Sequence, residues 1–287
     1  MSACLAFLWV VPTPGGAQPR LTDPTPPRYL HLTPADQTEG KKVLEEFRQH
    51  GWGQGGAYFL EFELHVLPRR GEERVVPGRL WGGRNETGPI TRVELQPGGK
   101  EAEQRLLVQV GVKSSVWSWT AAAGVVNPEG KAVFEPLAGT DLTAFDLQMP
   151  FLYWPDFVYE GVESLRDRPT HVFLMVPPVG SDDGELPKGI ARNVRIWLDT
   201  QFNALVQAEE LDRDQQPLKA ITVLDLKKVG EQWIVKSVDV RNELTRDKTQ
   251  FAVTGAALNQ NFPPELFEPA RLGDPAAAPD QVQKIDQ

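Results

Sequence analysis

The run YFLEFELHV at residues 58–66 decides the fold class of this chain. Apolar side chains occupy every second position from Tyr58 to Val66, and the acidic residues Glu61 and Glu63 lie between them. Successive side chains of a β-strand point to opposite faces of the sheet. The segment therefore predicts a strand with one buried face and one solvated face.

The same alternation recurs later in the chain, with turn-forming residues between the runs. Apolar residues dominate alternate positions within residues 106–110, 194–198 and 234–240. Several of the intervening turns are short enough to join neighbouring strands, which favours an antiparallel meander. We expect a mostly β (α+β) fold built on one long antiparallel sheet. The candidate turns are residues 97–99, 127–130, 212–217 and 229–231.

One helix is predicted before the sheet, at residues 34–50. Thr33 is a suitable N-cap, Pro34 suits the first helical position, and Gly51 is typical of a helix end. The apolar residues of this helix form one narrow stripe, which is enough to cover a sheet but not to be buried all round. The stripe consists of Val43, Leu44 and Phe47.

A second, short helix is expected at residues 140–149. Thr140 or Asp141 could cap this helix, and Phe145 and Met149 are four residues apart, so they share one face. The acidic, glycine-containing stretch at residues 179–189 predicts an exposed loop.

The first 17 residues predict an export signal. They carry no charge, and the apolar run at residues 3–11 has the length of a signal-peptide core but is too short to cross a bilayer. Small residues precede Gln18, so we expect cleavage after Ala17. The only cysteine, Cys4, lies within this signal. No later segment is apolar over a membrane-spanning length, which predicts a periplasmic protein that does not span the membrane.

The remainder of the chain divides into three parts. Residues 18–30 are rich in proline and predict an extended linker. Residues 31–270 are expected to form a single β domain, since all-β domains of this size occur as single units. Residues 271–287 are rich in Gly, Pro and Ala, and we expect them to be disordered.

Several function classes are disfavoured by composition and spacing. The chain has 30 Lys+Arg and 39 Asp+Glu, a formal charge of -9, which disfavours nucleic-acid binding. The glycine pattern at residues 51–56 follows the predicted helix instead of preceding one, so it indicates a turn and not a dinucleotide site. The four histidines lack the spacing and acidic partners of a metal site. We therefore predict no catalytic residue, no metal and no cofactor.

Aromatic residues are concentrated in the middle of the chain. Trp117 and Trp119 would share one face of a strand, and most of the others lie in or after the second helix. For each of these residues the alternative is a place in an ordinary hydrophobic core. The functional interpretation is an apolar cavity on a curved sheet under the two helices. The candidate ligand-binding residues are Trp117, Trp119, Phe145, Met149, Phe151 and Trp154.

The C-terminal half, over about residues 140–268, carries a series of short motifs in the order of consecutive strands. They are Arg195-x-Trp197-x-Asp199, Ala208-Glu209-Glu210-Leu211-Asp212, Asp225-Leu226-Lys227-Lys228-Val229-Gly230-Glu231-Gln232-Trp233, Val240-Arg241-Asn242, Lys248-Thr249, Asn259, Phe262 and Phe267. The stretch from Thr140 to Tyr159 fits the same pattern. This series resembles the LolA-like family of outer-membrane lipoprotein-sorting proteins.

The resemblance implies a half-open β-barrel with helices on its concave face and an apolar cavity that carries lipoprotein acyl chains to the outer membrane. The expected partners are lipid acyl chains or lipoproteins, with envelope proteins as further candidates. One alternative is a binding or regulatory module of the same fold that transports nothing, which a pocket filled by the chain's own aromatic side chains would favour. Another is a lipid hydrolase whose polar site is assembled from distant residues.

Overall fold

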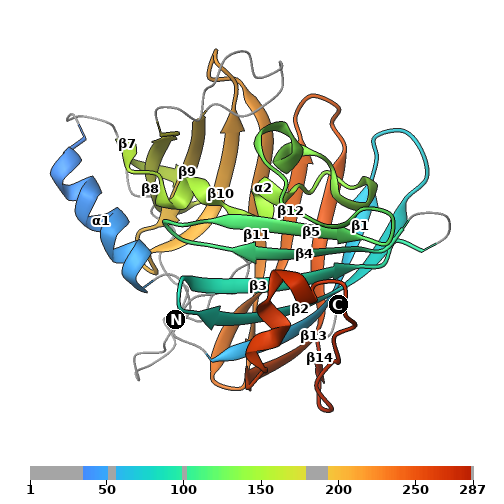
Figure 1. Ribbon diagram of the computed structural model, residues 1–287. Coiled ribbons are helices and arrows are strands. Elements are labelled where there is room, and N and C mark those ends of the chain that lie inside the picture. Colours follow the sequence, from blue (N-terminus) through green and yellow to red (C-terminus); the bar gives the residue numbers. More distant parts are fainter. Residues whose placement is uncertain (1–34, 51–55, 99–101, 179–192, 286–287) are drawn as a thin grey trace.

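The structure is a computed structural model that describes residues 35–50, 56–98, 102–178 and 193–285. Within these ranges the chain forms one large, curved antiparallel sheet with two α-helices beside it (Figure 1). The predicted mostly β fold is confirmed. The predicted signal peptide, the proline-rich linker and the loop at residues 179–189 lie outside the described residues. Among the described residues no helix has the length and apolar character needed to cross a membrane.

The sheet consists of two meanders joined through their long strands. Strands β1 to β6 follow one another in space, as do β7 to β13, and β1 pairs with β13 between the two series. The strands are β1 (Ala57–Leu67), β2 (Arg74–Asn85), β3 (Gly88–Leu95), β4 (Gln104–Gln109), β5 (Ser115–Thr120), β6 (Gly124–Val126), β7 (Asp156–Leu165), β8 (Arg168–Val176), β9 (Asn193–Asp199), β10 (Ala204–Leu211), β11 (Pro217–Val229), β12 (Gln232–Asn242), β13 (Lys248–Gln260) and β14 (Gln283–Lys284).

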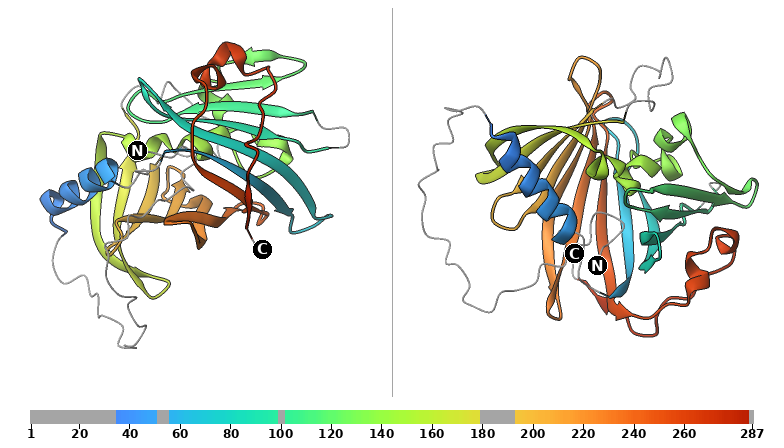
Figure 2. Two further views of the ribbon diagram at one scale, coloured as in Figure 1. Left: turned by 90° about the horizontal axis from the view of Figure 1, so that it is seen from below. Right: turned by 60° about the vertical axis from the view of Figure 1, so that its left-hand side comes forward.

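The sheet curves without closing into a barrel. Strands β6 and β7 form its two ends and do not pair with each other, and Figure 2 shows the curvature from two further sides. The main hydrophobic core lies on the concave face, where the alternate residues from Tyr58 to Val66 are buried as their spacing predicts. A half-open barrel is therefore the observed architecture.

The two α-helices cover the concave face but begin later than predicted. Helix α1 (Gln37–His50) begins after Asp36, whose carboxylate accepts hydrogen bonds from the backbone of Thr38 and Glu39, at 2.8 and 3.4 Å. A carboxylate at the N-cap satisfies the free amides of the first turn, so the predicted start at residue 34 is wrong. Leu44 and Phe47 of the predicted stripe are fully buried against the core.

Helix α2 (Ala144–Gln148) is shorter than the predicted helix at residues 140–149. Its N-cap is Thr143, which forms a capping box with Asp146. Neither predicted cap, Thr140 or Asp141, caps α2. The hydroxyl of Thr140 donates to the carbonyl of Leu137, at 2.8 Å, and the carboxylate of Asp141 accepts from Thr249, at 3.1 Å. Met149 ends α2 in a left-handed conformation. Short 3-10 helices complete this region at η1 (Gly130–Phe134), η2 (Leu137–Gly139) and η3 (Pro150–Tyr153).

Two of the four predicted turns join neighbouring strands. Residues 212–217 and 229–231 join β10 to β11 and β11 to β12, as expected. Residues 127–130 lead from β6 into a 3-10 helix instead of joining two strands. The turn at residues 97–99 lies partly outside the described residues.

Helix α1 also covers the outer edge of the end strand β7. The side-chain amide of Gln37 donates to the carbonyl of Tyr159 and accepts from its backbone amide, both at 2.8 Å. Gly40 permits this close approach, because a Cβ there would collide with the Tyr159 side chain. An unpaired strand edge can recruit other chains, so this contact protects one end of the sheet.

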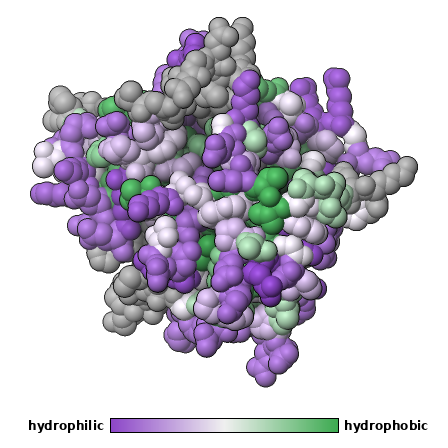
Figure 3. Space-filling model, in the orientation of Figure 1, coloured by the Kyte–Doolittle hydropathy of each residue, from purple (hydrophilic) through white to green (hydrophobic). Residues whose placement is uncertain are grey.

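The C-terminal segment, named here the strap (residues 261–285), lies across the convex face of β2, β3 and β4, and its last residue, Ile285, joins the main core. It contains the 3-10 helices η4 (Pro264–Phe267) and η5 (Pro269–Arg271). Leu272 and Ile285 are buried, so the prediction that residues 271–287 are disordered is wrong for 271–285. The face of the molecule seen in Figure 3 is mostly hydrophilic, with apolar side chains visible only in small patches.

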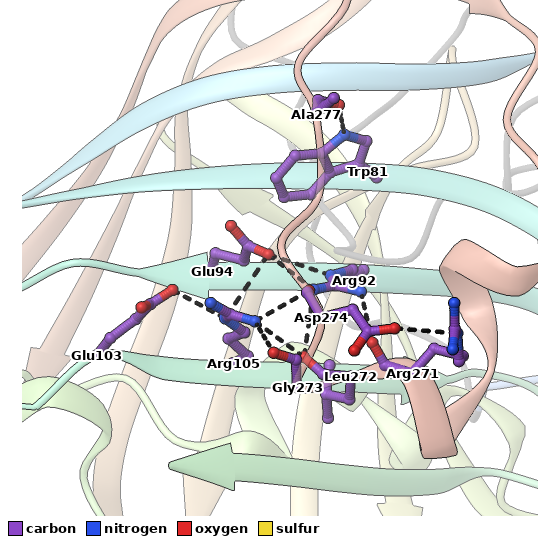
Figure 4. A network of polar contacts seen from close by, with 10 residues as sticks. All are labelled: Trp81, Arg92, Glu94, Glu103, Arg105, Arg271, Leu272, Gly273, Asp274 and Ala277. Atoms are coloured by element: carbon purple, nitrogen blue, oxygen red, sulfur yellow. Dashed lines mark hydrogen bonds and ion pairs between the residues drawn. The ribbon is translucent and has the colours of Figure 1, made fainter. Parts of the chain in front are cut away.

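The strap is held mainly through its backbone (Figure 4). The guanidinium groups of Arg92 and Arg105 and the indole of Trp81 donate hydrogen bonds to strap carbonyls. Glu94 holds Arg92 in place by an ion pair of 2.9 Å. The accepting carbonyls belong to Arg271, Leu272, Gly273, Asp274 and Ala277.

The strap ends in a strand that fills a fork in the sheet. Strand β12 pairs with β13 only at residues 248–252 of β13. Further along β13, β14 pairs with Gly255 and Ala256, which have β1 on their other side. The strap thus occupies the position that β12 leaves, and Lys284 adds an ion pair to Glu61, at 2.6 Å.

Leu272 tests whether the strap belongs to the cooperative fold. We expect Leu272→Ala to lower the free energy of unfolding by about 2–5 kcal/mol, because it removes a fully buried side chain. The exposed Leu244 is the matched control, and Leu244→Ala should change this free energy by less than about 0.5 kcal/mol. Urea denaturation measures both. Equal effects of the two substitutions would show that the strap folds independently of the sheet.

Candidate functional site: the covered concave face

The concave face is covered by α1 and by residues 137–154, which we name the cover segment. The cover segment contributes Phe145, Leu147, Met149 and Phe151 to the main core, each at most 5% exposed. The rings of Phe145 and Phe151 are 5.7 Å apart, and Trp154 packs beside both. The apolar face of the sheet is therefore filled by the chain's own side chains.

Arg48 joins the two covering elements. This residue of α1 donates from Nε to the carbonyl of Leu152 and from Nη2 to the carbonyl of Trp154, both at 2.7 Å. Burial lowers the pKa of Arg48, against the opposing influence of Tyr153 and Glu45. Two hydrogen bonds from a charged donor in a partly buried place are stronger than those of neutral groups. The helix and the cover segment are thus coupled through one side chain.

The first part of the cover segment is bound to the sheet by polar contacts. Arg74 donates to the carbonyl of Ala138, at 2.6 Å, and the side chain of Gln104 accepts from the Ala138 amide, at 2.9 Å. Asp141 exchanges hydrogen bonds with the hydroxyl of Thr249 in β13, at 2.9 and 3.1 Å. These contacts fix where the segment lies on the concave face.

A buried cluster of three charged residues makes the tightest contact between α2 and the sheet. Asp146 of α2 accepts from Lys219 of β11, at 2.8 Å, and also from the amide and hydroxyl of Thr143. Glu210 of β10 is the register partner of Lys219, and its carboxylate lies 3.9 Å from the Lys219 ammonium. All three residues are buried, with Lys219 the most exposed at 8%.

The protonation of the cluster follows from its burial. Burial raises the pKa of Glu210 well above its usual range, and the neighbouring Asp146 adds to this shift. For Asp146, the attraction of Lys219 and hydrogen bonds from Glu210, Lys219 and Thr143 outweigh burial, so its pKa is lowered. Asp146 Oδ1 and Glu210 Oε1 are buried, and neither has a hydrogen-bond partner among the other groups around it. A proton on Glu210 supplies the missing donor, and the cluster then carries no net charge.

The structure divides the six predicted ligand-binding residues into two groups. Phe145, Met149, Phe151 and Trp154 come together in the cover segment on the concave face. Trp117 and Trp119 share one face of β5 as predicted, but it is the convex face, where they pack with Leu107 and Leu272. Trp119 also lies under the guanidinium of Arg105, 4.4 Å from its ring centre. The two tryptophans are therefore placed to support the strap.

Sequence reasoning missed the Asp146, Glu210 and Lys219 cluster as a unit. The sequence feature that could have revealed it is a charged residue at a strand position where the alternation places an inward-facing side chain, as in Ala208-x-Glu210 and Lys219-x-Ile221. Asp146 lies 73 residues from Lys219, so only the fold brings them together. Within the described residues, no three His, Cys, Asp or Glu side chains are grouped so that they could hold a metal ion.

Comparison with solved structures defines the class of this fold. A DUF1329 family protein from Desulfovibrio piger superposes with a TM-score of 0.69 at 13% identity, over 82% of this chain and 98% of that chain. A putative outer membrane lipoprotein-sorting protein domain from Vibrio parahaemolyticus gives 0.67 at 16% identity, over 83% and 99%. A LolA superfamily protein from Nitrosomonas europaea gives 0.58 at 13% identity, over 79% and 96%. The fold is LolA-like.

Family membership rests on sequence. Residues 98–274 match a family model whose description reads "Uncharacterized protein", and the chain belongs to this family. No curated protein matches the chain in sequence.

Glu210 gives the cluster a defined dependence on pH. An unfolded glutamate has a pKa of about 4.3, and the folded value is raised, so this contribution to stability is complete below about pH 4 and is lost as the pH rises through the folded pKa. We expect Glu210→Gln to flatten this loss of unfolding free energy above about pH 4, as measured by urea denaturation at a series of pH values.

The exposed Glu231 supplies the control for this experiment. Glu231→Gln should leave the pH profile of the unfolding free energy unchanged. If the profiles of Glu210→Gln and the unsubstituted protein run parallel throughout the range above about pH 4, the pKa of Glu210 is not raised in the folded state.

Proposed function

We propose that this protein is a non-enzymatic periplasmic carrier that binds lipid or lipoprotein acyl chains and takes part in outer-membrane lipoprotein sorting. The acyl chains would lie on the concave face, beneath α1 and the cover segment. The observation that carries the proposal is that this apolar face is covered by two short elements, which contact it through apolar side chains and individual polar side chains. The exported location is inferred from the apolar N-terminus of the chain.

Binding would proceed by exchange of apolar groups. The side chains of Phe145, Met149 and Phe151 now occupy the surface that an acyl chain would contact. Each methylene removed from water contributes about 0.8 kcal/mol, so a long acyl chain can compensate for the displacement of several side chains. The ordered β-sheet would serve as the fixed wall, and the covering elements would move.

The names of two structural neighbours support this proposal. The protein domain from Vibrio parahaemolyticus is described as putatively lipoprotein-sorting, and the Nitrosomonas europaea protein is placed in the LolA superfamily. At 16% and 13% identity these proteins share the fold with this chain, and the shared activity is our proposal.

A second candidate is a binding or regulatory module of the same fold that transports nothing. The specific observation in its favour is that the concave face is already filled, with Phe151 and Leu152 completely buried. In this case the covering elements would stay in place, and partners would bind elsewhere on the molecule.

Arg48 distinguishes the two candidates. We expect Arg48→Ala to raise the fraction of protein that carries phospholipid after incubation with vesicles by about tenfold, because the loss of its two hydrogen bonds destabilises the covered state. Native mass spectrometry measures this fraction. The control is Lys41→Ala on the same helix, since Lys41 is exposed and only reaches Glu45, at 3.9 Å.

The carrier proposal fails if Arg48→Ala remains folded and neither it nor the unsubstituted protein takes up phospholipid or acylated peptide. That result would favour the non-transporting module.

A further inference from the structure

The charged cluster under α2 is divided between a covering element and the sheet. Lys219 and Glu210 project from neighbouring strands onto the concave face, whereas Asp146 belongs to the cover segment. The next register pair on the same face of these strands, Ala208 with Ile221, belongs to the apolar core. The charged pair Lys219 and Glu210 therefore lies directly beside apolar side chains of the concave face.

The charge of this position depends on where the cover segment lies. With Asp146 in place, its carboxylate balances the Lys219 ammonium, and burial keeps Glu210 neutral. If the cover segment leaves, as the proposed function requires, Asp146 leaves with it. In the open state water reaches this position, and Glu210 can ionise beside the Lys219 ammonium, 3.9 Å away. When an acyl chain buries the position again, burial again favours the neutral form of Glu210. A buried ammonium without a counter-charge is costly, so the lipid-bound state needs an anion at this point.

The cover segment itself shows what kind of molecule would fit. In α2 and the residue that follows, one carboxylate is accompanied by the apolar side chains of Phe145, Leu147 and Met149. The carboxylate contacts Lys219, and the apolar groups contact the wall. An anionic head next to a hydrocarbon body is the composition of an ionised fatty acid or an anionic lipid.

We propose that Lys219 binds the anionic headgroup of an acyl lipid in the place of the Asp146 carboxylate, while the acyl chain replaces the apolar side chains of the cover segment. This inference rests on the proposed function and adds the ligand's class to it. The shared chemistry is a carboxylate or phosphate joined to an acyl chain. Thr143 also leaves with the cover segment, so the Lys219 ammonium would be the main donor that remains for the headgroup.

The experiment compares ligands that share one acyl chain and differ in the headgroup. Oleate, oleoyl lysophosphatidate and methyl oleate would each displace the uncharged fluorescent probe N-phenylnaphthylamine from the full-length protein. We expect oleate, or both anionic ligands, to bind about tenfold more tightly than methyl oleate, the difference expected for one charge-assisted hydrogen bond. Preference for oleate alone identifies a free fatty acid, and preference for both identifies anionic lipids in general.

Two variants test the role of the cluster. The triple variant Asp146→Asn, Glu210→Gln and Lys219→Met makes the cluster neutral while approximately keeping its volume. We expect it to bind oleate, oleoyl lysophosphatidate and methyl oleate with equal affinity, because no charge remains at this position. The three ligands are compared within the variant, since loss of the cluster also loosens the cover segment. Lys219→Arg keeps the positive charge and should retain the preference. Circular dichroism establishes that each variant is folded.

The possible results separate this inference from the proposed function. Equal binding of oleate, oleoyl lysophosphatidate and methyl oleate overturns the headgroup site but leaves the carrier intact. A preference that survives in the folded triple variant also overturns it. Binding of none of the three ligands overturns both proposals. If the triple variant does not fold, the comparison of ligands on the unsubstituted protein still decides the question.

Discussion

A large sheet that curves without closing leaves two faces and two edges exposed. The other elements of this structure cover parts of these surfaces. Strands β6 and β7 do not meet, so the hydrogen-bonded ladder cannot complete itself. The concave face is covered by α1 and the cover segment, and the convex face of the first meander by the strap. Gln37 covers part of the edge at β7. Helix α1, the cover segment and the strap are thus each placed by a surface of the sheet that would otherwise face water.

The covering elements are recognised largely through their backbone. Arg48 binds two carbonyls of the cover segment region, and Arg92 and Arg105 bind carbonyls of the strap. Arginine suits this role because its fixed fork of donors can reach several acceptors at once. In the cluster around Lys219, by contrast, charged side chains pair with one another. Removing one partner there would leave a buried charge uncompensated, so this contact makes the position of α2 specific.

The β architecture could be predicted because its physical signal is local. From Tyr58 to Val66 the alternation of side chains reports directly which face is buried. The strap gave no such signal, because its hydrogen bonds are accepted by backbone carbonyls, which every residue has. Its Gly, Pro and Ala content suggested disorder. The alternation around Trp117 and Trp119 predicts that they share a face of the strand, but it does not tell on which side of the sheet the main core lies. Their position on the convex face could therefore not be predicted. The Lys219 cluster required contacts between segments that only the tertiary fold brings together.

The central claim is that α1 and residues 137–154 are movable covers on a fixed sheet. Hydrogen–deuterium exchange, followed by mass spectrometry with and without phospholipid vesicles, tests it most directly. We expect lipid to increase the exchange of amides in α1 and the cover segment, while amides of β1, β12 and β13 remain protected. Unchanged exchange in both covering elements, under conditions where lipid is bound, would contradict the claim.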